Sequence, residues 1–407
     1  MVKKIIHSLN LLFKYINKIF NGRSKKITVI LRALMATTIG ILLSFLFVDA
    51  LIFSTVSMFS SPEKKDNIMS DMFAQIADRR PVRKFEDRIV VINIGHSDRY
   101  EIAEALSLLS LFGPKVVGID INFENNISED DYLLVEAIKS LPASVLPLGV
   151  TQNEENPSEF SIKEKPFFYG EEGLNYGVVN LPQTIENGTI RDYAISFPTS
   201  QGNLPSFPLA LAEIYNPRGL ENLNKHNSGT GVISYHSKHF KIIGLNDIED
   251  NADDLSDKIV LIGSLDDSSD IFATPINFHT PGILIHASAL STILDRVWYF
   301  KIQKIFDYII AASICFLFML ASFGFKEKYK NYKGLTLRFL QGLMVLLLVL
   351  TGYSLYVDRN IIFDTSFTIM IVTFGFLASD IWIGLEAIWN TCSEKINKLD
   401  IKLNHNN

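Results

Sequence analysis

The sequence contains very little cysteine. Two of its 407 residues are cysteine, Cys315 and Cys392, and both lie in or beside long apolar runs. The polar stretch of residues 60–303 contains none, so it cannot form disulfides or a cysteine-based zinc site. That stretch must be held together by an apolar core, and its length is ample for one.

Catalytic and nucleotide-binding signatures are also missing. The sequence has no G-x-G-x-x-G loop, no G-x-x-x-x-G-K-[ST] phosphate loop, no H-E-x-x-H zinc helix and no G-x-S-x-G nucleophile turn. We therefore predict that the protein is not an enzyme and holds no cofactor and no metal. Its pI of 5.8 argues against a nucleic-acid partner, which would favour a basic face.

Acidic residues are absent from residues 1–48, which carry eight lysines and arginines. Residues 60–303 have the opposite balance, with about 35 acidic and about 20 basic residues, which the net charge of −6 hides. Acidic side chains that simply solubilise an exported domain are favoured over an acidic cation site. The two charge balances predict that these segments lie in different compartments.

Long apolar runs account for the mean hydropathy of +0.20. Four of them can cross a hydrocarbon core of roughly 30 Å, which needs about 20 residues. We predict transmembrane helices over residues 33–59, 304–325, 339–357 and 361–387. A cleaved signal peptide ending near Asp49 is the alternative for the first run, but that run continues through Val56, which favours an uncleaved anchor.

The orientation follows from lysine and arginine in the short flanking segments. Residues 1–32 form a basic arm and residues 326–338 a basic loop, and four spans place both on the same side of the membrane. We therefore expect both termini in the cytoplasm and residues 60–303 outside it. Mid-span acids such as Asp380 and Asp49 are costly in a membrane, and hydrogen bonding between helices explains them better than transport.

Strand and helix patterns alternate along residues 60–303. Buried β-branched runs predict strands at 88–94, 115–123, 144–150 and 258–263, and helical periodicity predicts helices at 99–112, 131–139, 205–215 and 281–294. The fold class is thus α/β, with a mixed, partly parallel sheet in a domain inserted between transmembrane helices. Residues 176–180 and 190–197 read as an antiparallel pair joined at Asn187-Gly188.

Polar side chains follow two of the predicted strands. His96 and Asp98 come directly after the first strand, where α/β sheets place ligands, although capping of the next helix by Ser97 or Asp98 is favoured over a ligand role. Asp120 and Asn122 alternate with apolar residues on the second strand. Because an ionised carboxylate inside an apolar run needs a partner, Asp120 marks either a pocket or a structural hydrogen bond.

A denser polar cluster follows the strand at 258–263. Its carboxylates Asp266, Asp267 and Asp270 lack the spacing of an EF-hand loop, so we do not predict a cation there. His286 lies near the start of the last predicted helix, where an imidazole could bind an anion, sense pH or play a structural part.

These motifs together resemble the CHASE type 2 family of extracellular sensor domains, which is associated with bacterial cyclases and histidine kinases. The resemblance covers about residues 70–300 and rests on these segments: Ile89-Val-Val-Ile-Asn-Ile94 with Asp98, Lys115-Val-Val-Gly-Ile-Asp-Ile-Asn-Phe123, Tyr176-Gly-Val-Val-Asn180 with Arg191, Lys258-Ile-Val-Leu-Ile-Gly263, Asp270, Thr274-Pro275, Pro281-Gly282 and His286-Ala287. It implies a multi-pass protein of the bacterial inner membrane with an extracytoplasmic, signal-receiving domain. The family's ligands are poorly defined, so the resemblance transfers no binding residue, and the candidate ligand-binding residues from the sequence are His96, Asp98, Asp120, Asn122, Arg191, Asp270, Thr274 and His286.

Receptors of this kind usually carry a cytoplasmic output domain. About 20 residues follow the fourth span here, which is too short for a cyclase or a kinase. Apolar residues spaced three or four apart over 385–403 predict instead an amphipathic tail, 388–407, continuing the last helix. It could pair with a second copy, dock on an effector protein, or lie on lipid headgroups.

The expected partners are therefore the bilayer, an unidentified envelope ligand, and a separate effector or a second copy of the chain. Three functions compete: a sensor that relays its signal to another protein, a structural scaffold that keeps the fold without sensing, and an envelope enzyme. The enzyme hypothesis requires Asp98, Asp120 and His286 to converge at the strand ends. Transport is the weakest hypothesis, because few polar residues lie within the spans.

Overall fold

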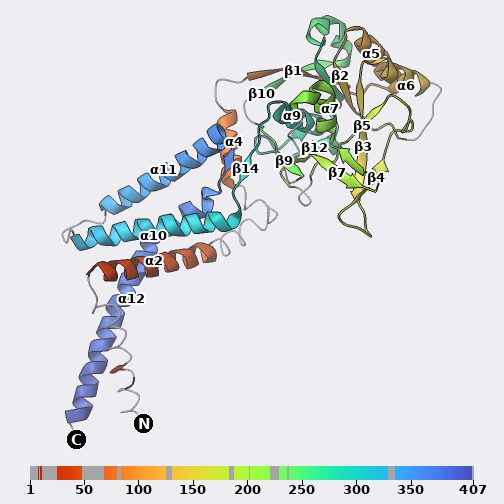
Figure 1. The fold of residues 1–407 in the computed structure, drawn as a ribbon. Coiled ribbons are helices and arrows are strands. Elements are labelled where there is room, and N and C mark those ends of the chain that lie inside the picture. The colour runs from red at the N-terminus through yellow and green to blue at the C-terminus, as the bar shows by residue number, and fades with distance from the viewer. Residues whose placement is uncertain are drawn as a thin grey trace. The chain divides into compact units, whose positions relative to one another are not determined.

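The computed structural model describes residues 8, 10–11, 25–47, 68–79, 84–124, 131–182, 188–200, 202–220, 229–235, 238–328 and 335–405. The chain divides into two compact units (Figure 1). One comprises residues 61–300, and the other comprises residues 1–60 with 301–407. We call them the α/β unit and the helical unit.

The α/β unit is built on a nine-stranded sheet, which confirms the predicted mixed α/β fold with a partly parallel sheet. Six strands run parallel in the order β10-β1-β11-β2-β3-β5, and β4, β7 and β8 extend the sheet beyond β3 with mixed directions. The strands are β1 (Lys84–Asn93), β2 (Val116–Asp120), β3 (Ser144–Gln152), β4 (Phe160–Glu164), β5 (Asn175–Val178), β7 (Ser196–Thr199), β8 (Gly202–Pro205), β10 (Lys238–Gly244) and β11 (Ile259–Gly263).

Two pairs of helices cover the two faces of this sheet (Figure 1). On one face α5 (Arg99–Leu111) and α6 (Asp131–Ser140) pack against Val90 and Ile92 of β1. On the other face α7 (Phe207–Tyr215) and α9 (Gly282–Leu294) pack against Ile89 and Val91. Because both faces are buried, the central parts of these strands, residues 89–92, 116–119 and 259–263, are apolar, which is why they appear as continuous apolar runs in the sequence.

The order of the strands differs from their order along the chain. The helix α5 connects β1 to β2 in parallel, but β11 from far along the sequence lies between them. The expected antiparallel pair at 176–180 and 190–197 is wrong, because β5 joins the sheet in parallel beside β3 and Val178 is buried there. Residue 187 of the expected turn lies outside the described residues. The local turn signal was outweighed by burial against β3.

Smaller elements complete the α/β unit. β6 pairs with β9 and β12 pairs with β13, both antiparallel. The bounds are α4 (Ile68–Asp78), β6 (Asp192–Ala194), β9 (Thr230–Val232), β12 (Ile271–Phe272), β13 (Thr280–Pro281), β14 (Phe300–Lys301) and the 3-10 helices Pro217–Gly219, Leu245–Asp247, Glu249–Asp254 and Ser268–Asp270.

A buried ionic network closes the amino-terminal end of the sheet. Glu86 of β1 is 5% exposed and accepts hydrogen bonds from Arg88 Nε (2.6 Å), Lys238 Nζ (2.8 Å) and Ser291 Oγ (2.6 Å). Asp295 Oδ1 accepts a hydrogen bond from Arg88 Nη2 at 2.6 Å, and the Asp295 carboxylate also forms an ion pair with Lys238. Burial alone would raise the pKa of Glu86, but its three hydrogen bonds outweigh burial and lower the pKa to about 2. We call these residues the Glu86 network.

In the part of the chain that the structure describes, the helical unit contains four helices that are long and apolar enough to cross a membrane, as predicted. They are α2 (Lys25–Phe47), α10 (Lys304–Lys328), α11 (Leu335–Arg359) and α12 (Thr365–His405), with the short strand β15 (Ile361–Ile362) before the last. The helix α2 begins inside the segment assigned to the basic arm, and α12 continues unbroken into the predicted tail. Most of the arm, Asp49 and residues 329–334 of the basic loop lie outside the described residues.

The helices α2 and α10 pack antiparallel, and α12 contacts both. At one end Phe45 of α2 and Tyr308 of α10 both contact the ring of Phe367, with ring centroids 5.0 and 4.8 Å away. Small side chains at the buried contact, including Ala33, Ala36 and Ala311, allow the helices to approach closely.

Candidate functional site

The candidate site lies where β2 and β11 end. Asp120 is the last residue of β2 and lies opposite Gly263, the last residue of β11. Its side chain is only 15% exposed, and among the described residues no hydrogen bond reaches its carboxyl group. Burial therefore raises the pKa of Asp120 to about 7. This carboxyl group can gain or lose a proton near neutral pH.

His286 of α9 faces Asp120. Its Nε2 lies 4.0 Å from Asp120 Oδ2, and its ring packs edge-on against Phe207 of α7 with centroids 5.4 Å apart. The side chain is 5% exposed, and its buried Nδ1 has no hydrogen-bond partner among the described residues. Burial lowers the pKa of His286 to about 4, and the nearby Asp270 carboxylate and a hydrogen bond with the backbone of Val179 offset this only in part. The imidazole is therefore neutral at pH 7.

Asp270 approaches the same helix at its first turn. Its carboxylate accepts a hydrogen bond from the backbone of Gly282, where α9 begins. A Cβ at Gly282 would lie 2.5 Å from both carboxylate oxygens, so this position requires glycine. Burial, and then repulsion from Asp120, raise the pKa of Asp270 to about 6. The structure thus brings three predicted residues together, and we call Asp120, Asp270 and His286 the strand-end cluster.

Asn93, which the sequence analysis did not single out, organises the loops around the cluster. Its Oδ1 accepts from the N–H groups of Gly95 (3.1 Å) and Leu265 (3.0 Å), and its Nδ2 donates to Asp266 Oδ2 at 3.0 Å. These bonds connect the loops that follow β1 and β11. An amide at the end of an apolar strand was the available signal, but one Asn in that position is too common to stand out.

The other predicted residues have local structural roles. Asp98 caps α5: its Oδ1 accepts from Glu101 N at 2.9 Å, while Glu101 Oε2 accepts from Asp98 N at 3.1 Å. The capping alternative is therefore confirmed. Thr274 Oγ1 donates to Asn277 O at 2.9 Å and closes the turn between β12 and β13.

Three more candidate residues make no hydrogen bond to the strand-end cluster in the part of the chain that the structure describes: Arg191, Asn122 and His96. Arg191 makes a bidentate pair with Asp71 of α4, at 2.6 Å for Nη2 and 2.8 Å for Nε. The exposed Asn122 donates to Glu124 at 3.0 Å. His96 is exposed in the turn after β1. Nothing in these contacts distinguishes the three residues as ligand-binding groups.

The carboxylates of the acidic loop after β11 accept hydrogen bonds from nearby residues. Asp267 Oδ1 accepts from Ser269 N (2.8 Å) and Ser269 Oγ (2.6 Å), and Asp266 accepts from Asn93. Among the described residues, no group of three or more His, Cys, Asp or Glu side chains is arranged to hold a metal ion. The loop shapes the edge of the sheet.

Two acids of the helical unit differ in their surroundings. Glu386 of α12 forms a bidentate ion pair with Arg32 of α2, at 2.6 Å for Nη2 and 3.1 Å for Nε. Asp380, one of the two mid-span acids noted in the sequence, is exposed on α12. An acid that faces outward in an apolar helix suits contact with another helix rather than the lipid interior.

The fold defines an α/β domain that lies in the chain between the first and second of the four long apolar helices found among the described residues. The sequence model of the CHASE2 domain family matches residues 69–323, from α4 into α10. The chain therefore belongs to the CHASE2 domain family, and its α/β unit is a sensor domain. Comparisons with curated proteins and with solved structures gave no match.

Proposed function

We propose that this protein is a receptor of the bacterial inner membrane that detects an envelope signal and relays it to a separate cytoplasmic effector. The charge distribution supports the orientation, with the acidic α/β unit outside and both termini in the cytoplasm. Membership of the CHASE2 family supports the sensing role.

The observation that carries the proposal is the unsatisfied state of the strand-end cluster. A buried polar group without a hydrogen bond costs free energy, commonly about 1–3 kcal/mol. His286 Nδ1 is such a group, and the carboxyl of Asp120 receives no hydrogen bond among the described residues. A ligand carrying a positive or hydrogen-bond-donating group would provide the missing partner to Asp120 and favour its ionised form. The carboxyl ends of parallel strands are also where α/β sheets bind ligands.

The position of the cluster provides a route for the signal. Asp270 accepts a hydrogen bond from the first residue of α9, and His286 belongs to that helix, which packs against β1 and β11. The chain continues from the end of α9 through residues 295–303 into α10. A ligand that binds more tightly when α9 is in one of two positions would favour that position. The shift of α9 would then move the segment that leads to α10.

The far end of α12 supports a cytoplasmic partner. Its apolar side chains Leu385, Ile388 and Leu399 are 50%, 63% and 49% exposed in the part of the chain that the structure describes. Such a face suits docking on an effector or on a second copy, and it also suits lipid headgroups.

Ligand-dependent stabilisation of the full chain tests sensing. The purified protein in nanodiscs is heated with a panel of amines, amino acids, metal ions and saccharides at pH 6 and pH 8. We expect one class to raise the unfolding temperature of the wild type and of the control His96→Gln, but not of Asp120→Asn. If no compound and no pH change affects the wild type, the scaffold hypothesis is favoured instead.

The relay is tested by purification in mild detergent. We expect the wild type to retain an effector or to form dimers, and Leu385→Ser/Ile388→Ser to lose that partner. Leu343→Ser/Leu346→Ser, at exposed positions on α11, is the matched control. If neither a partner nor a dimer forms with the wild type, the relay is wrong.

A further inference from the structure

The last helix, α12, carries a continuous line of apolar side chains. They follow one another at intervals of three or four residues, so they lie on one side of the helix. We call them the α12 stripe: Leu377, Ile381, Leu385, Ile388, Cys392, Ile396 and Leu399. Ile396 is half-buried, and the other six are exposed. A contiguous apolar surface of this kind marks an interaction site.

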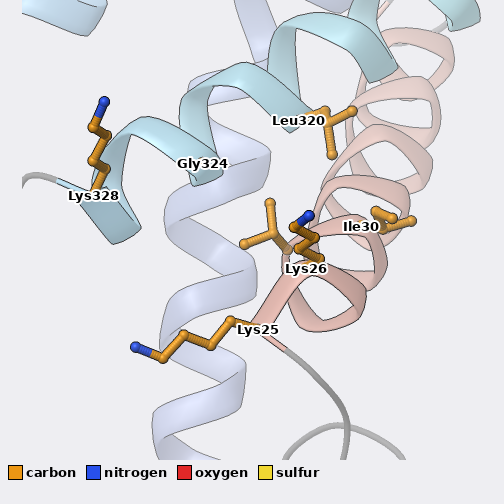
Figure 2. Close-up of a pocket in the computed structure, with 7 residues that line it drawn as sticks. Lys25, Lys26, Ile30, Leu320, Gly324 and Lys328 are labelled. Carbon is orange, nitrogen blue, oxygen red and sulfur yellow. The ribbon is translucent and has the colours of Figure 1, made fainter.

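The helices α2 and α10 pack against another face of α12 (Figure 2). Ile371 of α12 is fully buried in that contact. A Cβ at Gly375 would lie 2.4 Å from Met319 Cε of α10, and Glu386 pairs with Arg32 of α2. In the part of the chain that the structure describes, this packing leaves the α12 stripe exposed.

The described part of the N-terminal arm also contacts α12 beside the stripe. Asn10 Nδ2 donates a hydrogen bond to Asn397 Oδ1 at 3.4 Å. Each residue turns an α-helix by about 100°, so Asn397 points away from the side on which its neighbour Ile396 lies. This contact therefore does not account for the stripe.

Lipid headgroups cannot cover the whole stripe. The helix α12 runs unbroken for 41 residues. About 20 residues cross the hydrocarbon core, so a span that starts with the helix is complete near Leu385, and the stripe continues beyond it. A helix lies in the plane of the headgroups only after a bend, whereas an unbroken extension leads away from the bilayer. Ile388, Cys392 and Leu399 therefore face either water or a protein.

The stripe repeats every eleven residues. Leu377, Ile388 and Leu399 are eleven residues apart, and so are Leu385 and Ile396. Such a repeat corresponds to about 3.67 residues per turn, close to the 3.6 of an α-helix. The stripe therefore runs almost parallel to the helix axis. Two helices that carry it can pair along its full length with only a gentle right-handed supercoil.

A second copy of the chain matches this stripe better than a soluble effector does. Two copies in one membrane have the same orientation, so their α12 helices run parallel and present the stripe at the same depth. Identical faces can then meet around a two-fold axis. A cytoplasmic protein reaches only the part of the stripe beyond Leu385, whereas a second α12 also covers Leu377 and Ile381.

We infer that the α12 stripe pairs with the same stripe of a second copy, in a parallel two-helix contact that starts within the membrane and continues along the tail. The inference rests on the proposed function for the cytoplasmic position of the tail, and it identifies a second copy as the partner of that tail. The two copies of Cys392 then face each other across the contact.

Disulfide cross-linking of the full-length protein in membranes tests the pairing. Cys392 is exposed and Cys315 is buried, so the covalent dimer formed by an added oxidant should disappear in Cys392→Ser. A disulfide requires Cβ atoms about 4 Å apart. In the Cys392→Ser background we expect Ile388→Cys, on the stripe, to give at least about fivefold more covalent dimer than Asn390→Cys, an exposed position on the opposite side of the helix.

A second pair of variants tests the contact without cysteine chemistry. Ile396→Lys/Leu399→Lys places two charges on the stripe, and the control Asn390→Lys/Glu394→Lys places lysines at exposed positions on the opposite side. Analytical ultracentrifugation in mild detergent measures the dimer. We expect the stripe variant to raise the dissociation constant at least about tenfold, because the pair would bury unpaired ammonium groups, and the control to leave it unchanged. Circular dichroism verifies that the helices are intact.

Two results would overturn the inference. Equal cross-linking at positions 388 and 390 would indicate random encounters, and a monomeric wild type would show that the stripe does not pair with itself. A monomer that retains an effector would refute the pair and leave the proposed relay intact. A stable pair whose unfolding temperature no compound changes would refute the sensing role and leave the pair intact, so the two failures are distinguishable.

Discussion

The two ends of the parallel sheet contrast sharply in how they treat buried charge. At the amino-terminal end Glu86 is surrounded by donors from Arg88, Lys238 and Ser291, and its pKa falls to about 2. At the carboxyl end Asp120 is similarly enclosed but accepts no hydrogen bond among the described residues, and its pKa rises to about 7. Burial raises the pKa of both carboxyl groups, so their hydrogen-bond partners decide whether the net pKa shift is downward or upward.

On the proposed function, this difference separates a structural carboxylate, Glu86, from a ligand-binding one, Asp120. A fully hydrogen-bonded network fixes one arrangement and has little left to offer a ligand. A buried carboxyl that accepts no hydrogen bond, beside an imidazole whose Nδ1 has no hydrogen-bond partner among the described residues, is costly to the fold and available for binding. The following predictions separate the two ends, beginning with the largest effect.

Replacing Glu86 should cause the largest loss of stability. Glu86→Gln removes the more buried of the two carboxylates that Arg88 and Lys238 share, and Asp295 remains paired with both. Breaking a buried pair typically costs about 3–5 kcal/mol, so we expect a loss near the lower end of that range. Denaturant unfolding at pH 7 measures this loss. Because the pKa of Glu86 is lowered, its contribution is present above about pH 4.5 and disappears as the pH falls toward 2, so the variant should approach the wild type in acid. A loss below 1 kcal/mol at pH 7 would contradict the structural role.

Replacing Asp120 should raise the stability of the fold at pH 8, the opposite of the effect of replacing Glu86. Its folded pKa of about 7 exceeds the usual value of 3.8, so the folded state binds an extra proton between these values and the wild type loses stability as the pH rises through them. Asp120→Asn cannot ionise and should be about 2–4 kcal/mol more stable at pH 8, with no difference near pH 3.5. Unfolding across pH 3.5–8 measures this. A destabilised Asp120→Asn at pH 8 would show that Asp120 has an essential partner.

Adding a methyl group at Gly282 should disturb the cluster through geometry alone. Gly282→Ala places a Cβ where the oxygens of Asp270 lie, so the carboxylate must move away from the start of α9. We expect a loss of about 1–3 kcal/mol, as for other overpacked sites. Gly342→Ala, in open space on α11, is the control and should change little. If Gly282→Ala is neutral, the contact between Asp270 and α9 is dispensable.

Removing the cap of α5 should have the smallest effect. Asp98→Ala loses the hydrogen bond to Glu101 N, and such losses cost about 1 kcal/mol. The same variant should leave ligand responses at the cluster unchanged, because Asp98 is engaged in its own helix. A lost ligand response with normal stability would restore Asp98 as a binding residue.

Much of the α/β unit could be predicted because burial leaves a local pattern. The apolar runs around Ile89 and Ile259 form strands, as predicted, and the polar residues that follow each run mark where those strands end. The order of the sheet could not be predicted, because nothing local indicates that β11 inserts between β1 and β2. The pair at 176–180 and 190–197 failed for the same reason, since pairing with β3 is a long-range event.

The site was predicted only as separate residues. Asp120 stood out because an acid interrupts an apolar strand, and His286 because it begins an apolar helix. Their contact depends on α9 packing against the sheet, which the sequence does not specify. Glu86 was missed altogether, because it lies among charged neighbours and resembles an ordinary surface residue.

The unbroken course of α12 has a mechanical consequence. Its 41 residues rise by about 1.5 Å each and form a rod of about 60 Å, twice the thickness of the hydrocarbon core. If the proposed relay rotates α12 among the packed helices, an unbroken rod carries that rotation toward the exposed Leu385, Ile388 and Leu399. The apolar face would then sweep around the helix axis and present a different surface to whatever lies beside it.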